Sequence, residues 1–404
     1  MQGKKLIKKL RLKNFLSYGS EGQEITLEPL NVLIGPNASG KSNVIEALRL
    51  LQATSKDLAD AIRKGGGVQE WLWKGREIYS TAEIEVVVAY LTGSAPLRYR
   101  LCFTSTGQRF EIIDEVIGNE PEIGESPEVV LFYQYKDALI MRNVTQTEAP
   151  PGMPVGRIIG PLRREELNAD QSILSQRKDI DIYPEITYLG NQFANIRLYT
   201  DWNLGRYAAP RMPQKTDDPD DFLLEDASNL GLILNNLQHR TKTRGLLIEK
   251  FRKFYDTADD ITTKVQGGTI QVFIHEKGLH RPIPAARLSD GTLRYLCLLT
   301  ILCHPTPPPL VCIEEPELGL HPDILPTIAE LLIEAAQRTQ LVITTHSDTL
   351  VSALTEIPET VLVCEQDETG THSRRLEAES LKKWLESYSL GELWSMGEIG
   401  GTRW

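Results

Sequence analysis

Gly35-Pro36-Asn37-Ala38-Ser39-Gly40-Lys41-Ser42 comes directly after the apolar run 31–34 and directly before apolar residues at helical spacing. The stretch matches the pattern GxxxxGK[ST] at a transition from strand to helix. Its glycines let successive backbone N–H groups point inward, next to the positive end of the helix. Lys41 would reach the β- and γ-phosphates of a nucleotide, and Ser42 would give an oxygen to Mg²⁺. The predicted nucleotide-binding residues of this loop are Gly35, Asn37, Ala38, Ser39, Gly40, Lys41, Ser42 and Asn43.

Carboxylates end the apolar run 310–313 in the sequence Glu314-Glu315-Pro316-Glu317. Ligands of open α/β sheets collect at the carboxyl ends of the strands. Neighbouring side chains on an extended chain point to opposite sides, so Glu314 and Glu315 can have separate roles. We expect Glu314 to hold the metal together with Ser42, and Glu315 to act on the attacking water. A charged turn after a strand would explain one carboxylate easily but the whole cluster poorly.

Two more polar segments lie at the ends of apolar elements. His346 follows the apolar run 341–344 and is expected beside Glu315, within reach of a γ-phosphate; a structural hydrogen-bonding role is the alternative. Residues 288–292, Leu-Ser-Asp-Gly-Thr, open an apolar helix for which Ser289 is a plausible N-cap. A Ser-x-Gly helix start also offers a hydroxyl and N–H groups to an anion, so Ser289 and Gly291 are predicted nucleotide contacts.

Composition limits the class of protein. The chain has 404 residues, of which 41% are hydrophobic and 25% charged, as in ordinary globular proteins. Its net charge of −11 argues against a surface wholly devoted to nucleic acid. None of the five cysteines forms a CxxC pair, which favours a reducing compartment. The longest apolar stretch, 295–303, is far below the ~20 residues of a membrane span, so we expect a cytoplasmic protein without membrane contact.

Two charged stretches interrupt this balance. The N-terminal one is a basic strand that could face DNA, and its cations are Lys4, Lys5, Lys8, Lys9, Arg11 and Lys13. The other is acidic and is expected to be a solvated loop rather than a metal or partner site; its members are Asp217, Asp218, Asp220, Asp221, Glu225 and Asp226.

Hydrophobic periodicity divides the chain into three segments, 1–145, 146–265 and 266–404. The first is β-rich, with strands expected at 24–27, 30–34, 83–91, 97–104 and 129–135 and a helix from Lys41 to the Gly65-Gly66-Gly67 break. The second opens with a Pro- and Gly-rich linker at 145–164, continues with helices at 229–239 and 246–255, and has no sustained heptad repeat.

The third segment alternates strands and helices. Strands are expected at 270–274, 310–313, 341–344 and 360–364, and helices at 289–302, at 323–337 and from Ser347. Such alternation indicates a parallel sheet covered on both faces. The predicted fold class is α/β: a P-loop NTPase with an N-terminal β-rich subdomain and a compact mixed insertion.

In order and spacing these segments resemble the head domain of ABC-type ATPases, in the branch that includes RecF, SMC, Rad50 and OLD proteins. Residues 35–42 resemble Walker A, 288–292 the signature motif, 311–315 Walker B, 318–321 the D-loop and His346 the switch histidine. Lys13-Asn14-Phe15 resembles the usual opening of this branch. With a compact middle segment in place of a coiled coil and no Toprim nuclease domain, the chain is most similar to stand-alone ATPases of the AAA-15 and AAA-21 types.

This sequence departs from the family pattern at three places. Glu314 stands where Asp is commoner, the signature is SDGT rather than SGGQ, and the Q-loop glutamine is not assigned, Gln134 and Gln192 both being candidates. The resemblance implies a two-fold homodimer, or a higher oligomer, in which each ATP with Mg²⁺ lies between one subunit's Walker A and the partner's signature helix. It also implies Lys41, Glu315 and His346 as catalytic residues.

Two functions from different classes follow from the resemblance. The first is an ATPase that dimerises around ATP and drives a DNA-metabolism, DNA-repair or anti-phage defence complex, with a separately encoded effector such as a Toprim-type nuclease. The alternative is a nucleotide-gated module that sequesters a toxin or effector with little turnover. Trp384, Trp394 and Trp404 recur every ten residues near the C-terminus. They are expected either to pack on the sheet or to dock a partner.

Overall fold

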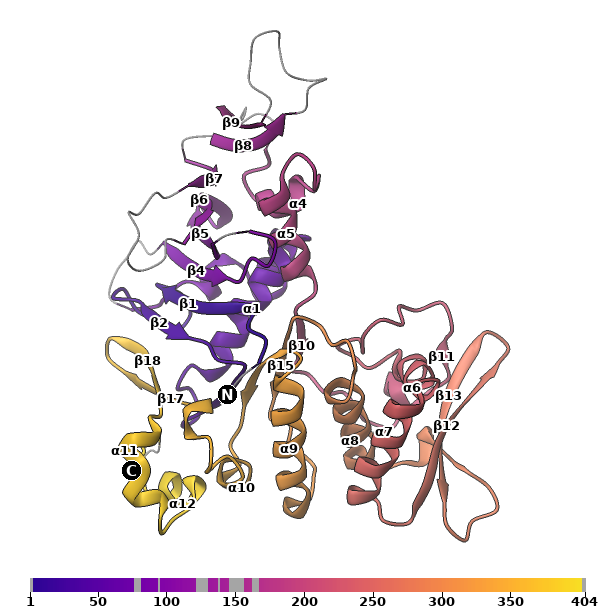
Figure 1. Cartoon of the computed structure of the whole chain (residues 1–404). Coiled ribbons are helices and arrows are strands. Elements are labelled where there is room, and N and C mark those ends of the chain that lie inside the picture. The colour runs from indigo at the N-terminus through magenta and orange to yellow at the C-terminus, as the bar shows by residue number, and fades with distance from the viewer. Residues whose placement is uncertain are drawn as a thin grey trace.

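The computed structural model describes residues 3–75, 81–93, 95–120, 130–136, 139–144, 156–161 and 167–401. This part of the chain contains one mostly parallel and two antiparallel sheets. Figure 1 shows the larger antiparallel sheet at the upper left, the parallel sheet among helices below it, and the smaller antiparallel sheet at the right. Among the described residues, no helix is both long and apolar enough to cross a bilayer.

The parallel sheet has the strand order β10-β15-β16-β3-β17-β18. Its strands are β3 (Leu30–Ile34), β10 (Arg197–Tyr199), β15 (Leu310–Glu314), β16 (Gln340–Thr344), β17 (Val361–Asp367) and β18 (Gly370–Arg375). Only the hairpin of β17 and β18 is antiparallel. Every residue of β3 and β16 is buried, as expected for strands covered on both faces. The predicted α/β class is confirmed.

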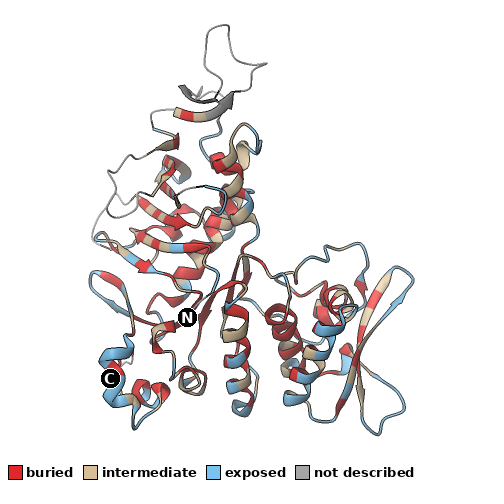
Figure 2. Ribbon diagram, viewed as in Figure 1, coloured by how far each residue is buried: buried red, intermediate tan, exposed pale blue. Residues whose placement is uncertain are grey.

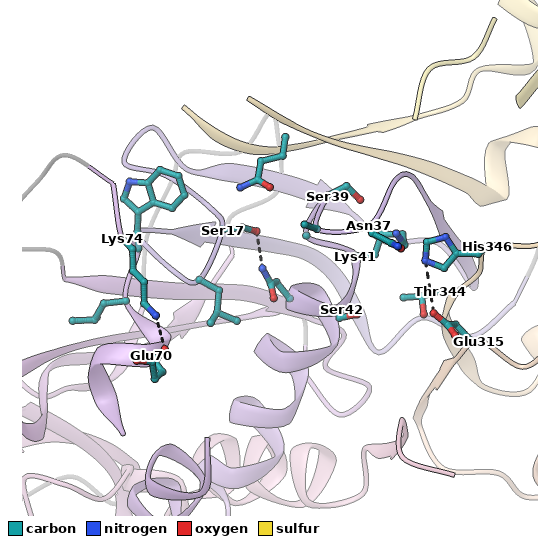
Figure 3. A pocket seen from close by; sticks show the side chains of 17 residues that line it. Ser17, Asn37, Ser39, Lys41, Ser42, Glu70, Lys74, Glu315, Thr344 and His346 are labelled. Atoms are coloured by element: carbon teal, nitrogen blue, oxygen red, sulfur yellow. Dashed lines mark hydrogen bonds and ion pairs between the residues drawn. The ribbon is translucent and has the colours of Figure 1, made fainter. Parts of the chain in front are cut away.

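Register brings the polar strand ends together. Glu314 is opposite Thr344, and Thr344 is opposite Leu33, one residue before the end of β3. The three strands therefore end at one edge of the sheet, where Figure 3 shows Asn37 and Lys41 near Glu315 and His346.

The larger antiparallel sheet has the order β2-β1-β4-β5-β6-β7-β8-β9. Its strands are β1 (Ile7–Lys13), β2 (Gln23–Thr26), β4 (Ala82–Val88), β5 (Leu97–Thr106), β6 (Arg109–Asn119), β7 (Leu131–Gln134), β8 (Leu139–Val144) and β9 (Gly156–Pro161). Strand β9 lies inside the span 145–164 that was predicted to be a linker, so that prediction is wrong for 156–161. An edge strand tolerates the glycines and the terminal proline that suggested a loop.

The helix that begins at Lys41 is shorter than predicted. Helix α1 (Lys41–Thr54) ends ten residues before Lys64, the last residue of α2 (Leu58–Lys64). The carboxylate of Asp57 accepts a hydrogen bond from the Asp60 N–H (2.8 Å) and so starts a new helix. The remaining short elements beside this sheet are α3 (Val68–Trp71), α4 (Ile173–Gln176) and α5 (Pro184–Ala194).

The smaller antiparallel sheet corrects a second prediction. It consists of β11 (Gln214–Lys215), β12 (Ala258–Gln266), β13 (Thr269–Glu276) and β14 (Ile283–Pro284). The strand predicted at 270–274 is β13, but it pairs antiparallel with β12 instead of joining the parallel sheet. Gly267 and Gly268 both have positive φ, which closes a two-residue hairpin between the two strands.

The other helices cover the parallel sheet and the smaller sheet. They are α6 (Leu230–Gln238), α7 (Thr241–Phe254), α8 (Asp290–Leu302), α9 (Leu325–Ala336), α10 (Asp348–Ser352), α11 (Ala378–Leu385) and α12 (Leu390–Ser395). Short 3₁₀ turns are η2 (Ala209–Arg211), η3 (Ala285–Arg287), η4 (Pro322–Ile324) and η5 (Pro358–Thr360). The two large cores, red in Figure 2, lie on opposite faces of the parallel sheet.

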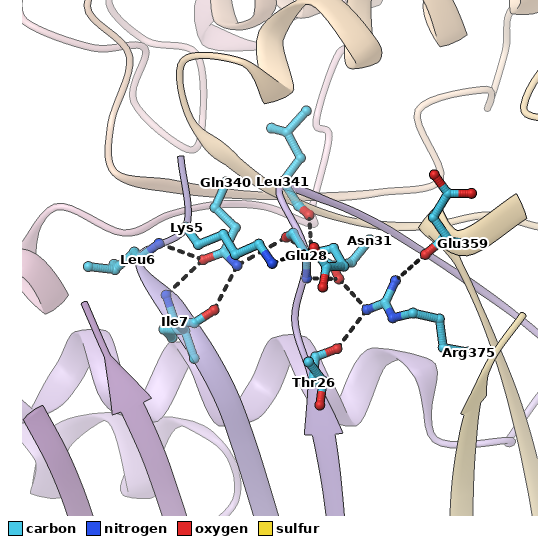
Figure 4. A network of polar contacts seen from close by, with 10 residues as sticks. All are labelled: Lys5, Leu6, Ile7, Thr26, Glu28, Asn31, Gln340, Leu341, Glu359 and Arg375. Carbon is cyan, nitrogen blue, oxygen red and sulfur yellow. Dashed lines mark hydrogen bonds and ion pairs between the residues drawn. The ribbon is translucent and has the colours of Figure 1, made fainter. Parts of the chain in front are cut away.

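A buried glutamine joins the parallel sheet to the larger antiparallel sheet (Figure 4). The Oε1 atom of Gln340, in β16, accepts hydrogen bonds from the N–H groups of Leu6 (3.1 Å) and Ile7 (2.9 Å). Its Nε2 atom donates to the carbonyls of Ile7 (2.8 Å) and Glu28 (3.1 Å). Asn31 of β3 donates to the Glu28 carbonyl as well (2.6 Å). The start of β1 is thus fixed to the sheet that carries the phosphate loop.

We predict that Gln340→Ala lowers the free energy of unfolding by about 3 kcal/mol, because buried backbone groups lose their partner. The measurement is a urea titration. Gln337→Ala, at an exposed position beyond the end of α9, is the control and should leave the midpoint unchanged. Equal midpoints for both variants would contradict the assigned role of Gln340.

Candidate functional site

The loop 35–42 takes a backbone conformation that depends on its glycines. Gly35, Ala38 and Gly40 all have positive φ. A Cβ atom on Gly35 would lie 2.2 Å from the Cys364 carbonyl oxygen, and one on Gly40 would lie 2.3 Å from the Thr371 Oγ1. Residues with side chains are therefore excluded at both positions, and the loop closes tightly before α1.

Lys41 is buried and folds back over this loop. Its ammonium donates hydrogen bonds to the carbonyl oxygens of Gly35 (2.8 Å) and Pro36 (2.9 Å). Burial lowers the pKa of Lys41, while the nearby Cys364, Glu315 and Glu314 act in the opposite direction. The two carbonyl oxygens are neutral acceptors, whereas a phosphate oxygen would give this ammonium a negatively charged one.

The loop has the features of an anion site apart from Lys41. The hydroxyl of Ser39 is buried and has no hydrogen-bond partner among the described residues. Helix α1 has 14 residues, its N-cap residue is Gly40, which offers no side chain, and its first turn has no acidic residue. No side chain of the helix start neutralises the positive end of the helix, so its first N–H groups can donate to an anionic ligand. These residues fit the phosphates of a nucleotide.

Glu314 and Ser42 form the candidate metal site. The Ser42 hydroxyl lies close enough to the Glu314 carboxylate to donate a hydrogen bond to it. Burial raises the pKa of Glu314, and the negative charges of Glu46, Glu315 and Asp201 raise it further, against the hydrogen bond from Ser42. A divalent cation would offset this repulsion, so the donor set fits Mg²⁺. Asp201, just beyond β10, was not predicted because a three-residue strand carries no clear sequence signal.

Glu315 occupies a strained backbone conformation at the end of β15. Its φ is +45°, which is rare for a residue with a side chain. Its N–H donates to the Thr344 carbonyl (2.9 Å), and its own carbonyl accepts from Nη1 of Arg294 (3.1 Å). The Oε1 atom of Glu315 lies 3.7 Å from Nε2 of His346. The predicted pair is thus brought together.

Glu317 holds the segment that carries His346. Its Oε1 atom accepts hydrogen bonds from the Thr345 hydroxyl (2.7 Å) and from the His346 N–H (2.9 Å). The sequence shows Glu317 as a member of the carboxylate cluster, but its local sequence does not indicate these contacts. Burial, with the charge of Lys41, lowers the pKa of His346, while Glu315 and Glu317 act in the opposite direction. The imidazole is therefore held in its neutral form near pH 7.

Most of the predicted site residues line a cavity of about 560 Å³, but Gly35 and Glu314 are not on its wall. Glu315, Thr344 and His346 lie at one end of the view in Figure 3, and Glu70 and Lys74 lie at the other, with Lys41 and Ser39 between them. Leu16, Leu72 and Trp73 also line the cavity. The predicted residues on its wall are Asn37, Ala38, Ser39, Gly40, Lys41, Ser42, Asn43, Glu315 and His346.

The signature segment lies outside this cavity. Ser289 caps α8, as predicted, by accepting a hydrogen bond from the Thr292 N–H (3.0 Å). Gly291 is packed against the segment that follows β15, since a Cβ there would lie 2.6 Å from the Gly319 carbonyl oxygen. Neither residue is on the cavity wall. Of the glutamines, neither Gln134 nor Gln192 lines the cavity.

The charge network predicts opposite shifts for two variants. We expect Lys41→Met to raise the pKa of His346, because a positive charge that disfavours the imidazolium is removed. Glu315→Gln should lower it, because a favourable negative charge is removed. Histidine NMR titrations measure both. The pKa of His304, which burial lowers without a contribution from Lys41 or Glu315, should stay constant; shifts of the same sign at His346 would contradict the network.

Comparisons with known proteins agree with this architecture. The family model AAA_21, described as "AAA domain, putative AbiEii toxin, Type IV TA system", matches residues 30–137 and 157–352. A comparison with curated proteins found no match.

Two solved SMC structures are similar over nearly their whole length. The Smc head domain of Pyrococcus furiosus, with an extended coiled coil and bound to the C-terminal domain of ScpA, has a TM-score of 0.57 and 13% identity, covering 94% of this chain and 98% of that one. The SmcHead bound to the C-winged helix domain of ScpA has a TM-score of 0.56 and 13% identity, covering 93% and 99%. The chain belongs to the AAA_21 family, and its fold is that of an ABC-type ATPase head of the SMC and RecF branch.

Proposed function

We propose that the chain binds ATP with Mg²⁺, hydrolyses it, and forms a homodimer around it. The observation that carries the proposal is the cavity in which Lys41, Glu315 and His346 converge beside a loop whose buried Ser39 hydroxyl has no partner in the part of the chain that the structure describes. Phosphates fit the loop, and a carboxylate and a neutral imidazole lie where the terminal phosphate would end.

Each residue would have a defined task in hydrolysis. Lys41 and the N–H groups of 38–42 would hold the phosphates, and Ser42 and Glu314 would hold Mg²⁺. When bound, the metal would neutralise charge on the transferred phosphoryl group. Glu315 would orient the attacking water and accept its proton, and the neutral His346 would donate a hydrogen bond to the γ-phosphate. Glu317 would keep His346 at that place.

The direction of the nucleotide follows from the two ends of the cavity. The terminal phosphate belongs at Glu315 and His346, so the base would extend toward Leu16, Leu72 and Trp73. Apolar and aromatic surfaces suit the faces of a purine. The Glu70–Lys74 ion pair at the same end offers polar groups to the edge of the base.

A homodimer would complete the site. Ser289 is exposed, caps a long helix and lies outside its own subunit's cavity. A two-fold arrangement would bring each Ser289 and Gly291 to the partner's nucleotide, in the manner implied by the resemblance to ABC-type heads. ATP binding would then favour the closed pair, and hydrolysis would release it.

For the dimer, we predict that Glu315→Gln preserves ATP binding but accumulates as an ATP-bound dimer, because the water is no longer activated. Size-exclusion chromatography with and without ATP measures the fraction of dimer. The double variant with Lys41→Ala should remain monomeric in both conditions. A Glu315→Gln protein that stays monomeric at saturating ATP would refute the sandwich arrangement.

For the base site, we predict that Trp73→Ala weakens ATP binding about ten-fold, as loss of one stacking contact would. Binding of inorganic tripolyphosphate should be unaffected, and calorimetry measures both. Trp384→Ala, on an exposed side chain outside the cavity, is the matched control. Equal losses for ATP and tripolyphosphate would mean that Trp73 acts on the phosphate loop instead of the base.

The proposed biological role is to drive a DNA-metabolism or anti-phage defence complex with a separately encoded effector, such as a Toprim-type nuclease. The family description, which names a toxin–antitoxin system, supports a defence context and also favours the second candidate, a nucleotide-gated module that sequesters a toxin. Measuring single-turnover ATP hydrolysis separates the two candidates, because a sequestering module needs almost no ATP hydrolysis.

Two surfaces bear on these partners. Trp394 is buried and donates to the Gly401 carbonyl (3.1 Å), whereas Trp384 is 43% exposed; Trp404 lies outside the described residues. The tail therefore combines packing with an exposed aromatic that suits a protein partner. In the basic strand, Lys5, Lys9 and Arg11 already form ion pairs with Glu28, Glu24 and Glu83. This pairing offsets part of the positive charge that this strand would present to DNA.

A further inference from the structure

Arg211 is a buried arginine of the middle segment that binds the start of the signature segment, residues 288–292, and the turn before it. Its side chain is 6% exposed and lies at the end of η2, in the connection that follows β10. Nε donates to the Leu204 carbonyl (2.8 Å), and Nη1 donates to the carbonyls of Leu288 (2.5 Å) and Ala285 (3.5 Å). Nη2 binds the carboxylate of Asp290.

The chemistry of these contacts requires a guanidinium. A buried cation is costly unless its donors are satisfied, and here three carbonyls and one carboxylate surround it. The planar fork of arginine reaches acceptors on both sides of one residue, whereas a lysine ammonium acts as a single point charge. The contacts of Arg211 therefore fix the direction in which residues 285–290 leave β14 and enter α8.

Ser289 lies between two residues that Arg211 binds. Leu288 and Asp290, its two neighbours, are both bound by Arg211, while the Ser289 hydroxyl bonds to the N–H (3.0 Å) and the hydroxyl (2.8 Å) of Thr292. Arg211 thus fixes the backbone on either side of Ser289 without touching its side chain.

We propose that Arg211 is a positioning residue that presents Ser289 to the nucleotide of the partner subunit. This inference rests on the proposed ATP sandwich and extends it to a residue of the middle segment, outside the phosphate loop, the carboxylate cluster and His346. Arg211 is not on the wall of its own subunit's cavity. Its loss should therefore reduce turnover and leave ATP affinity unchanged.

Three variants test the role within one chain. Arg211→Ala should lower kcat about a hundred-fold, as a small misplacement of a reacting contact can, with the Kd for ATP unchanged. Arg211→Lys should recover little of the loss, because it lacks the fork. Arg338→Ala is the matched control: its guanidinium also binds two carbonyls, of Glu334 (3.1 Å) and Leu302 (2.7 Å), but at the far end of α8. It should lower thermal stability and keep turnover near wild type.

A mixing experiment distinguishes action on the partner from a general defect. Arg211→Ala is mixed with Glu315→Gln before ATP is added, and product is measured in the first turnover. In a mixed dimer, the Arg211→Ala subunit has an intact cavity and Glu315, and its partner supplies an intact Ser289. Each variant alone should give almost no product, whereas the mixture should give a burst. Ser289→Ala mixed in the same way is the reference.

The outcomes separate the two proposals. A burst with both Ser289→Ala and Arg211→Ala supports the role of Arg211. A burst with Ser289→Ala alone overturns that role and leaves the sandwich intact, as does wild-type turnover of Arg211→Ala. If Ser289→Ala also gives no burst, the sandwich itself is refuted and the proposal for Arg211 with it.

Discussion

The parallel register of β3, β16 and β15 is the constraint on which the rest of the site depends. It sets Glu314 opposite Thr344, and Thr344 opposite Leu33, so the phosphate loop, the carboxylates and the His346 segment all leave the sheet at one edge. A slip of one residue would turn Glu314 and its neighbours to the other face. The buried Gln340 protects this register, because it is both the first residue of β16 and the partner of β1.

The sequence predicted those parts of the site that follow directly from a buried strand. Residues 35–42, Glu314, Glu315 and His346 each come just after an apolar run, and the fold brings them together as expected. Asp201, Trp73 and Arg211 were missed for two reasons. Their contacts join segments far apart in the chain, and their local sequence has no motif. Glu317 belongs to the carboxylate cluster, but its hydrogen bonds to Thr345 and His346 depend on the fold. A short strand such as β10 or a single 3₁₀ turn such as η2 gives no periodic signal.

The middle segment was predicted to be an insertion, but it contributes a strand to the parallel sheet of the ATPase-head fold. Strand β10 is an edge strand of the parallel sheet, paired with β15, and the chain continues from it through Asp201 to Arg211. The same short connection therefore brings the negative charge of Asp201 near Glu314 at one end and binds the signature segment through Arg211 at the other. The boundaries at 145 and 265 stay predictions, and β12 extends across the second one to Gln266.

Helix α8 links the proposed dimer contact at Ser289 to the proposed hydrolytic residue Glu315. Its N-cap is Ser289, the residue that we propose is presented to the partner, and five residues later Arg294 binds the carbonyl of Glu315. Glu315 has a strained φ that a fixed hydrogen bond on its N–H and another on its carbonyl maintain. Because the helix that would meet the partner also holds the backbone of Glu315, the proposed catalytic carboxylate, movement of α8 on dimer closure would act on Glu315 without any additional relay.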